Sequence, residues 1–138
     1  MAKPPEEALH QYLQGLAGLN TLVGNRIRTG AAAVKDQRPF VVIEPPNVLL
    51  EQHTTGSTGL ATSRIPIHCE GTSYKEAREI ATLIFDTFKN GWDKTTKMSG
   101  LSVRYASPRV RGKSPNVVGG NDVNFHSIEI ELNLVHVV

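Results

Sequence analysis

Residues 59–92 combine an alternating strand, a turn and a long amphipathic helix, and this unit constrains the fold more than any other segment. In the strand over 60–70, Ile65, Ile67 and Cys69 share one face because successive side chains in a strand point to opposite faces. The helix carries a wide apolar stripe at the spacing that favours one buried face. The stripe consists of Ala77, Ile80, Ala81, Ile84, Phe85 and Phe88. The unit predicts a helix packed on one face of a sheet.

The ends of this helix are also marked in the sequence. Ser73 and Glu76 have the spacing of a capping box, in which side chains satisfy backbone donors at the helix start. Asn90 and Gly91 form a stop signal at its other end. Glu76 and Glu79 lie opposite the apolar stripe, where Lys75 and Arg78 also lie, so we expect a solvated face and no part in catalysis.

Further elements are predicted on both sides of this unit. A helix begins near Pro4 and Pro5 and carries leucines at helical spacing through Leu19, and a short helical turn follows over 20–23. The predicted strands cover residues 39–44, 60–70, 100–105 and 123–138, with 48–53 as a continuation or partner of the first. The segments expected to be irregular are 30–38, a flexible turn over 54–59 and a long loop over 108–121. Pro66 predicts an edge or a bulge in its strand.

This order of elements predicts the fold class. Runs of strands with helices between them form an α+β domain. We expect one domain over residues 1–138, with a mainly antiparallel sheet of about four to five strands and two helices packed on one face.

The last predicted strand is apolar on both faces near its end. Ile128 to Leu134 alternate with Glu129, Glu131 and Asn133, but Val135 and Val137 continue the polar face with apolar side chains. Such a strand either bends or contacts something beyond its own domain, such as a neighbouring subunit.

Composition excludes several classes of protein. A single cysteine, Cys69, allows no internal disulfide and no multi-cysteine zinc or iron–sulfur site within one chain. No segment approaches the length of a transmembrane helix, and the N-terminus does not resemble a secretory signal. The chain is expected to stay inside the producing cell, with no membrane partner and no cofactor.

A catalytic or metal site is not predicted. His68 and Cys69 are adjacent in a strand and point to opposite faces, so they do not easily bind one ion. We expect Cys69 to be a small buried hydrophobe. An enzyme that uses His68, Cys69 or His126 stays open as an alternative, and metal analysis with a thiol-reactivity test of Cys69 distinguishes it.

A stretch over 94–121 contains basic residues and no acidic residue. Its cations include Arg104, Arg109, Arg111 and Lys113. A local field of one sign can steer an anionic partner, so a nucleic-acid-binding module is a second alternative. The same pattern is also typical of a solvated basic loop.

The order of these motifs resembles the small tail-completion proteins of tailed bacteriophages and prophages, the head–tail joining or tail-terminator-like family. The resemblance covers residue 6 to the C-terminus. It rests on an N-terminal helix that ends in 19–27, the proline-led strand at 39–43, the 59–69 strand, the helix from Ser73 that closes on Trp92, and the alternating terminal strand. Two segments depart from the family pattern, namely 28–37 and 108–121.

The resemblance implies a structural, non-enzymatic protein of virion assembly, located at the head–tail junction of the virion and in the host cytoplasm before assembly. Family members form rings, commonly hexamers, that end the tail tube and dock to head connector proteins. Partners would be further copies of the chain, the tail-tube protein and the connector, with a passing contact to DNA. The candidate subunit or partner contacts are Leu49, Leu50, His53, Arg104, Arg109, Arg111, Lys113, Val135 and Val137.

Overall fold

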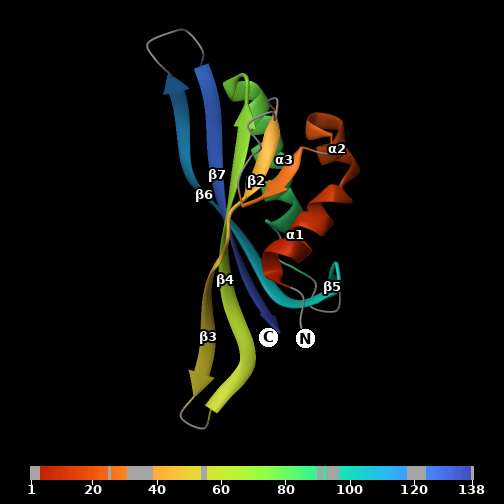
Figure 1. The fold of residues 1–138 in the computed structure, drawn as a ribbon, viewed down its shortest axis with the longest axis vertical. Helices are drawn as coiled ribbons and strands as arrows, with labels where there is room; N and C mark the ends of the chain where they lie inside the picture. Colours follow the sequence, from red (N-terminus) through yellow and green to blue (C-terminus); the bar gives the residue numbers. More distant parts are fainter. Residues whose placement is uncertain are drawn as a thin grey trace.

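The protein folds into a curled sheet with its helices on one side (Figure 1). A computed structural model describes residues 4–24, 26–30, 39–53, 56–89, 92, 97–117 and 124–137. The helices are α1 (Pro5–Gln14), α2 (Ala17–Val23) and α3 (Tyr74–Phe88). The strands are β1 (Ile27–Thr29), β2 (Phe40–Ile43), β3 (Asn47–His53), β4 (Gly56–Gly71), β5 (Lys97–Met98), β6 (Leu101–Val117) and β7 (Asn124–Val137).

The sheet is mainly antiparallel, as predicted, but larger than expected. Its strand order is β1-β2-β4-β7-β6-β5, and β3 pairs with β4 off this path. Only the β1–β2 pair is parallel among the described strands. The described residues thus form seven strands and three helices, where the sequence predicted four to five strands and two helices.

Strand β4 is central, and its two halves have different partners on one side. Its later half pairs with β2, ending at Ile43 opposite Ile67, and its earlier half pairs with β3, beginning at Asn47 opposite Arg64. Pro66 lies at this change of partner, and its carbonyl oxygen accepts from the Glu44 N–H at 2.9 Å. In a strand, the N–H and C=O of one residue point to the same side. The N–H that Pro66 lacks would therefore point to the side where the pairing of β4 changes from β2 to β3 and the ladder is already interrupted. The predicted edge or bulge at Pro66 is wrong, because β4 lies inside the sheet and its register with β2 and β7 does not shift there, but the proline does mark this local break.

The N-terminal leucines are divided between two helices. The Gly15 N–H still bonds the carbonyl oxygens of Gln11 and Tyr12, but Leu16 is extended with ψ of 111° and starts a new helix. The short turn expected over 20–23 is the second half of α2. Leu9, Leu13 and Leu19 are nonetheless all buried, because both helices pack on the same sheet face.

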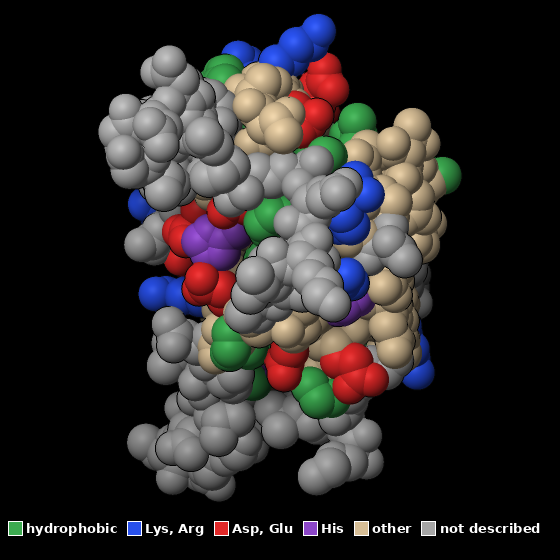
Figure 2. Space-filling model, turned by 45° about the horizontal axis from the view of Figure 1, so that its top comes forward, with side chains coloured by type: hydrophobic (Ala, Val, Ile, Leu, Met, Phe, Trp, Pro, Cys, Tyr) green, Lys and Arg blue, Asp and Glu red, His purple; other side chains and the backbone are tan. Residues whose placement is uncertain are grey.

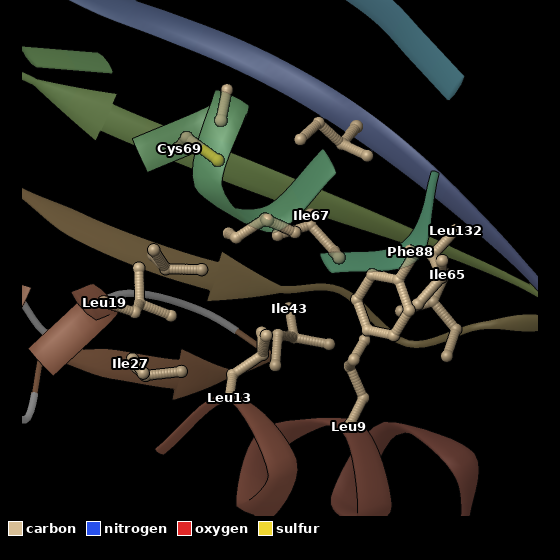
Figure 3. Packing of buried hydrophobic residues seen from close by; sticks show 14 of the residues in the cluster. Leu9, Leu13, Leu19, Ile27, Ile43, Ile65, Ile67, Cys69, Phe88 and Leu132 are labelled. Atoms are coloured by element: carbon tan, nitrogen blue, oxygen red, sulfur yellow. The ribbon is translucent and has the colours of Figure 1, made fainter. Parts of the chain in front are cut away.

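One core fills the space between helices and sheet (Figure 3). The predicted stripe of α3 is buried at Ala77, Ile80, Ala81, Ile84 and Phe88, with Phe85 partly buried against the cluster. It packs over Ile65, Ile67 and Cys69 of β4, the face predicted from the alternation. Tyr12 and Phe88 both contact Trp92, with ring centroids 5.1 and 5.8 Å from it. This core identifies 59–92 as the scaffold of the domain.

The start of α3 is capped as the sequence predicted. The Ser73 hydroxyl accepts from the Glu76 N–H at 3.2 Å. The Glu76 carboxylate reaches back and accepts from the Thr72 N–H at 2.9 Å and the Thr72 hydroxyl at 3.1 Å. The return bond therefore goes to the residue before the cap, a variation on the usual capping box.

Two expected irregular segments are strands instead. The loop predicted over 108–121 is wrong up to Val117, because β6 continues through it beside β7. The turn predicted over 54–59 is wrong from Gly56, where β4 begins. Residues 31–38, 54–55, 90–91 and 118–123 lie outside the described residues, as does the stop signal predicted at Asn90 and Gly91.

Candidate interaction surfaces

The sheet face turned away from the helices carries charged side chains in its centre. His68 of β4 lies between two carboxylates, with its Nε2 2.7 Å from Glu44 Oε1 and 3.4 Å from Glu129 Oε1. Figure 2 shows acidic side chains gathered beside a histidine on one face of the molecule, in agreement with these contacts. These three side chains link β7, through His68 of β4, to the segment after β2. They therefore stabilise the pairing of neighbouring strands on the open face of the sheet.

Cys69 lies on the opposite face from His68, as the alternation predicted. Its side chain is fully buried in the core. Burial raises the pKa of the Cys69 thiol, and the nearby Glu70 charge raises it further. A buried thiol that stays protonated is neither a nucleophile nor a good metal ligand. Within the described residues, no group of three or more His, Cys, Asp or Glu side chains could hold a metal ion.

A buried polar pair that the sequence did not reveal lies under the start of β3. Ser63 is fully buried and His136 is 5% exposed, and Ser63 Oγ lies 2.7 Å from His136 Nε2. His136 Nδ1 lies 3.1 Å from the Val137 carbonyl oxygen. If Nδ1–H donates to that carbonyl, Nε2 accepts the serine proton and both groups are satisfied. The only sequence signal was that His136 continues the buried alternation of Leu132 and Leu134.

The candidate residues of β3 and β7 lie at one end of the sheet. Leu49 of β3 is the register partner of Thr62, and Thr62 is in turn the partner of Val135. Leu50 pairs with Ala61 and His53 with Gly56, further along the same hairpin. Val135 and Val137 are partly exposed. The structure therefore brings this first group of candidates together.

The basic candidates are divided along β6. Arg104 follows Val103, the partner of His136, and so lies at the end of the sheet that holds Val135. Arg109 is opposite Glu131, and Arg111 and Lys113 follow towards the other end of the sheet. The register thus spreads the backbone positions of the four residues along β6 and does not bring them to one end of the sheet.

An apolar groove lies between α3 and the later part of β6, which the sequence analysis did not find. It has a volume of about 220 Å³ and is lined by Tyr74, Arg78, Ala81, Thr82 and Phe85 of α3, Val110 of β6 and Ile128 of β7. Tyr74 is 39% exposed and Val110 is 46% exposed, which is unusual for large apolar side chains in this molecule. The sequence did not indicate this groove, because Val110 was predicted to lie in a loop and not in a strand.

Comparison with known families gives the identity of the fold. Residues 7–115 match the family described as tail completion protein gp17. The chain belongs to this family. The resemblance to phage tail-completion proteins that the sequence indicated is therefore confirmed, and it covers both the strand-to-helix unit and most of β6.

A solved structure has the same fold as this tail-completion protein. A chain of the virion of a native gene transfer agent particle matches with a TM-score of 0.74 at 15% sequence identity, covering 98% of this chain and 96% of that chain. No curated protein matches the sequence. The helices of the described residues are too short or too polar for any of them to cross a bilayer.

Proposed function

We propose that this tail-completion protein is a ring-forming subunit that ends the tail tube and docks to the head connector. Family membership and the fold support a structural role in virion assembly. The observation that carries the finer proposal is the position of two hairpins at opposite ends of one sheet (Figure 1). The β3–β4 hairpin projects at one end, and the β6–β7 hairpin at the other.

Such an arrangement suits a closed ring of identical subunits. Head-to-tail contact requires two different patches on each subunit, and it forms a ring when the rotation closes. In this proposal Leu49, Leu50, His53, Val135 and Val137 belong to one patch. Arg109, Arg111 and Lys113 belong to the other, while Arg104 lies nearer the first. The assembled form is a hexamer at the head–tail junction of the virion, in contact with the tail-tube protein and the connector.

The test is a double substitution, Val135→Asp and Val137→Asp. Both side chains are partly exposed on the sheet face away from the core, so the fold should be retained. A carboxylate in an apolar subunit contact is desolvated without a partner, and each 1.4 kcal/mol lost weakens association about tenfold. We expect a lower assembled mass by light scattering, measured with and without the tail-tube protein.

The matched control is Asn133→Asp, which adds a carboxylate to the same face of β7 in the middle of the strand, between the two proposed patches. It should leave the assembled mass unchanged. If the double variant is folded and assembles as the unmodified chain does, Val135 and Val137 are not contact residues. If the unmodified chain forms no ring even with the tail-tube protein, the ring-forming function itself is wrong.

A further inference from the structure

Three large hydrophobic side chains are exposed among the described residues, and they lie on two different surfaces. Tyr74 and Val110, which are 39% and 46% exposed, line the groove between α3 and β6. The third, Tyr105, is 54% exposed and does not line that groove. We propose that Tyr105 of one subunit inserts into the groove of a neighbouring copy of the chain. The proposal rests on the ring-forming function and names the contact that would hold the ring together.

The two surfaces lie on opposite faces of the sheet. Residues that oppose each other in an antiparallel pair share a face. Tyr105 is opposite Val135, whose partly exposed side chain lies on the face turned away from the helices. Val110 is opposite Ile130, which is buried in the core on the side of the helices (Figure 1). Val135 and Ile130 are also about 17 Å apart along β7 at the usual rise per residue. Tyr105 therefore does not reach the groove of its own subunit.

The groove offers the groups that a buried tyrosine side chain needs. Its lining is mainly apolar, and the exposed Arg78 and Thr82 add polar groups to it. A cavity of about 150 Å³ accommodates benzene, so a groove of about 220 Å³ has room for a phenol ring. A buried tyrosine hydroxyl usually finds a hydrogen-bond partner, and a guanidinium supplies donors. In the proposed contact, the Tyr105 hydroxyl accepts a hydrogen bond from Arg78.

Each half of this contact adjoins one of the two proposed patches. Tyr105 lies beside Val135 of the first patch. Val110 lies between Arg109 and Arg111 of the second patch. A side chain that projects and a groove that receives it are different surfaces, so the contact is of the head-to-tail type that closes a ring. Aromatic side chains that fill pockets carry much of the binding energy of an interface, which makes Tyr105 the anchor of this one.

Substitutions at Tyr105 test the anchor. Tyr105 is exposed and outside the core, so Tyr105→Asp should retain the fold and weaken ring assembly about thirtyfold. The matched variant Tyr105→Phe keeps the aromatic ring and lacks only the hydroxyl, so it should weaken assembly no more than about tenfold. Assembly is measured by light scattering over a concentration series, with the tail-tube protein present.

A double-mutant cycle tests the partner of the hydroxyl. Tyr105→Phe and Arg78→Met each remove one side of the proposed hydrogen bond, and Arg78 is an exposed residue of α3 whose replacement leaves the core intact. We expect the double variant to assemble about as weakly as the weaker single variant, because the second change has no bond left to break. Effects of the two changes that simply add would overturn the pairing of Tyr105 with this groove.

Site-directed cross-linking tests the contact with Tyr105 left in place. One variant carries Val137→Cys, on the same face of the sheet as Val135, and a second carries Thr82→Cys, an exposed α3 residue that lines the groove. The native Cys69 is buried and does not compete. The two variants are mixed, assembled with the tail-tube protein, and treated with a short bismaleimide. We expect a covalent dimer from the mixture and none from either variant alone.

The matched control replaces Thr82→Cys with Gln14→Cys, an exposed residue of α1 that does not line the groove. It should give no dimer with Val137→Cys. A second comparison uses Tyr74→Asp in the groove and Ala17→Asp outside it. Both place a carboxylate at the first residue of a helix, where it favours the fold. Tyr74→Asp should weaken assembly about tenfold, and Ala17→Asp should not.

The outcomes separate this contact from the ring itself. Rings that form as readily with Tyr105→Asp, or that give no mixed dimer, overturn the insertion of Tyr105 and leave the ring-forming function standing. A Tyr74→Asp variant that keeps its rings but no longer binds the tail-tube protein also overturns it, because the groove then holds that partner. Absence of rings in every mixture, the unmodified chain included, overturns both proposals.

Discussion

Gly71 stands where β4 turns into α3, and the backbone there leaves no room for a side chain. A Cβ at this position would lie 2.7 Å from the Ala77 nitrogen and 3.1 Å from the Ser73 carbonyl oxygen. Neither backbone atom can move without disturbing the start of α3. We expect Gly71→Ala to lower the free energy of unfolding by about 1–3 kcal/mol, as overpacking does, measured by urea denaturation.

Gly15→Ala is the matched control for this substitution. Its added Cβ would meet the Tyr12 carbonyl oxygen at 3.4 Å, an ordinary contact, and its φ of −81° suits alanine. We expect no loss of stability, and a gain of about 0.4–1 kcal/mol is consistent with a stiffer unfolded chain. Equal stability of Gly71→Ala and the unmodified protein would show that the turn relaxes more than its geometry suggests.

Cys69 gives a second prediction at the scale of one residue. Full burial keeps its thiol protonated and out of reach, so alkylation with a maleimide at neutral pH should be undetectable in the folded protein. Modification should become complete once urea unfolds the chain. Rapid labelling of the native protein would contradict the assigned burial and would restore the enzyme alternative that uses this thiol.

Individual buried residues could be predicted where apolar and polar side chains alternate strictly along a strand. They were harder to predict where a polar side chain occupies a buried position. Ile65, Ile67 and Cys69 follow a simple period of two, so their face was assigned correctly. Ser63 and His136 obey the same period but are polar. Their burial depends on a hydrogen bond between residues far apart in the chain, and no local pattern encodes such a partner.

At the scale of elements, the capping of α3 is a strong local signal with a measurable effect. Ser73→Ala removes the acceptor for the Glu76 N–H and should lower the free energy of unfolding by about 1 kcal/mol. Ser73→Asp keeps an acceptor at the same place and should retain most of that stability. A Ser73→Ala variant as stable as Ser73→Asp would mean that Glu76 alone sustains the cap, through its bonds to Thr72.

Strand β6 shows why element boundaries were harder to predict. Its later part contains Pro108, Gly112 and Pro115, which all disfavour a strand by intrinsic preference. Pairing with β7 overrides that preference, and register shifts between Val103 and Tyr105 and between Val110 and Gly112 absorb the irregularity. The long alternation of β7 was the available clue, because a buried strand of that length requires a partner on each side.

At the scale of the whole molecule, the family resemblance could be predicted from the sequence. The positions of the candidate interaction surfaces could be predicted only in part. The resemblance rests on packing patterns that recur in the order of the elements, and the family match confirms it. The Leu49 and Val135 segments, which were predicted to share one patch, lie at the same end of the sheet. The groove depends on how α3 lies beside Val110 of β6 and Ile128 of β7, which only the three-dimensional arrangement defines.

The outer part of the β3–β4 hairpin, residues 51–60, can be removed without dismantling the core. Replacing residues 51–60 with Asn-Gly joins Leu50 to Ala61, a register pair of β3 and β4, through the two-residue turn that hairpins favour. The shortened chain keeps Ala61, Ser63 and the rest of the buried face of β4. Because the lost segment pairs mainly within itself, we expect Tm to change by no more than about 4 °C.

Assembly should respond very differently from stability. The shortened chain should remain monomeric in sedimentation analysis under conditions in which the unmodified protein forms rings with the tail-tube protein. Leu50→Asp in the full-length chain is the companion variant, because Leu50 is a candidate contact that the shortened chain retains. If loss of assembly occurs with the shortened chain but not with Leu50→Asp, the contact lies in residues 51–60 and not at Leu50. Rings formed by both variants would show that neither Leu50 nor residues 51–60 join the subunits.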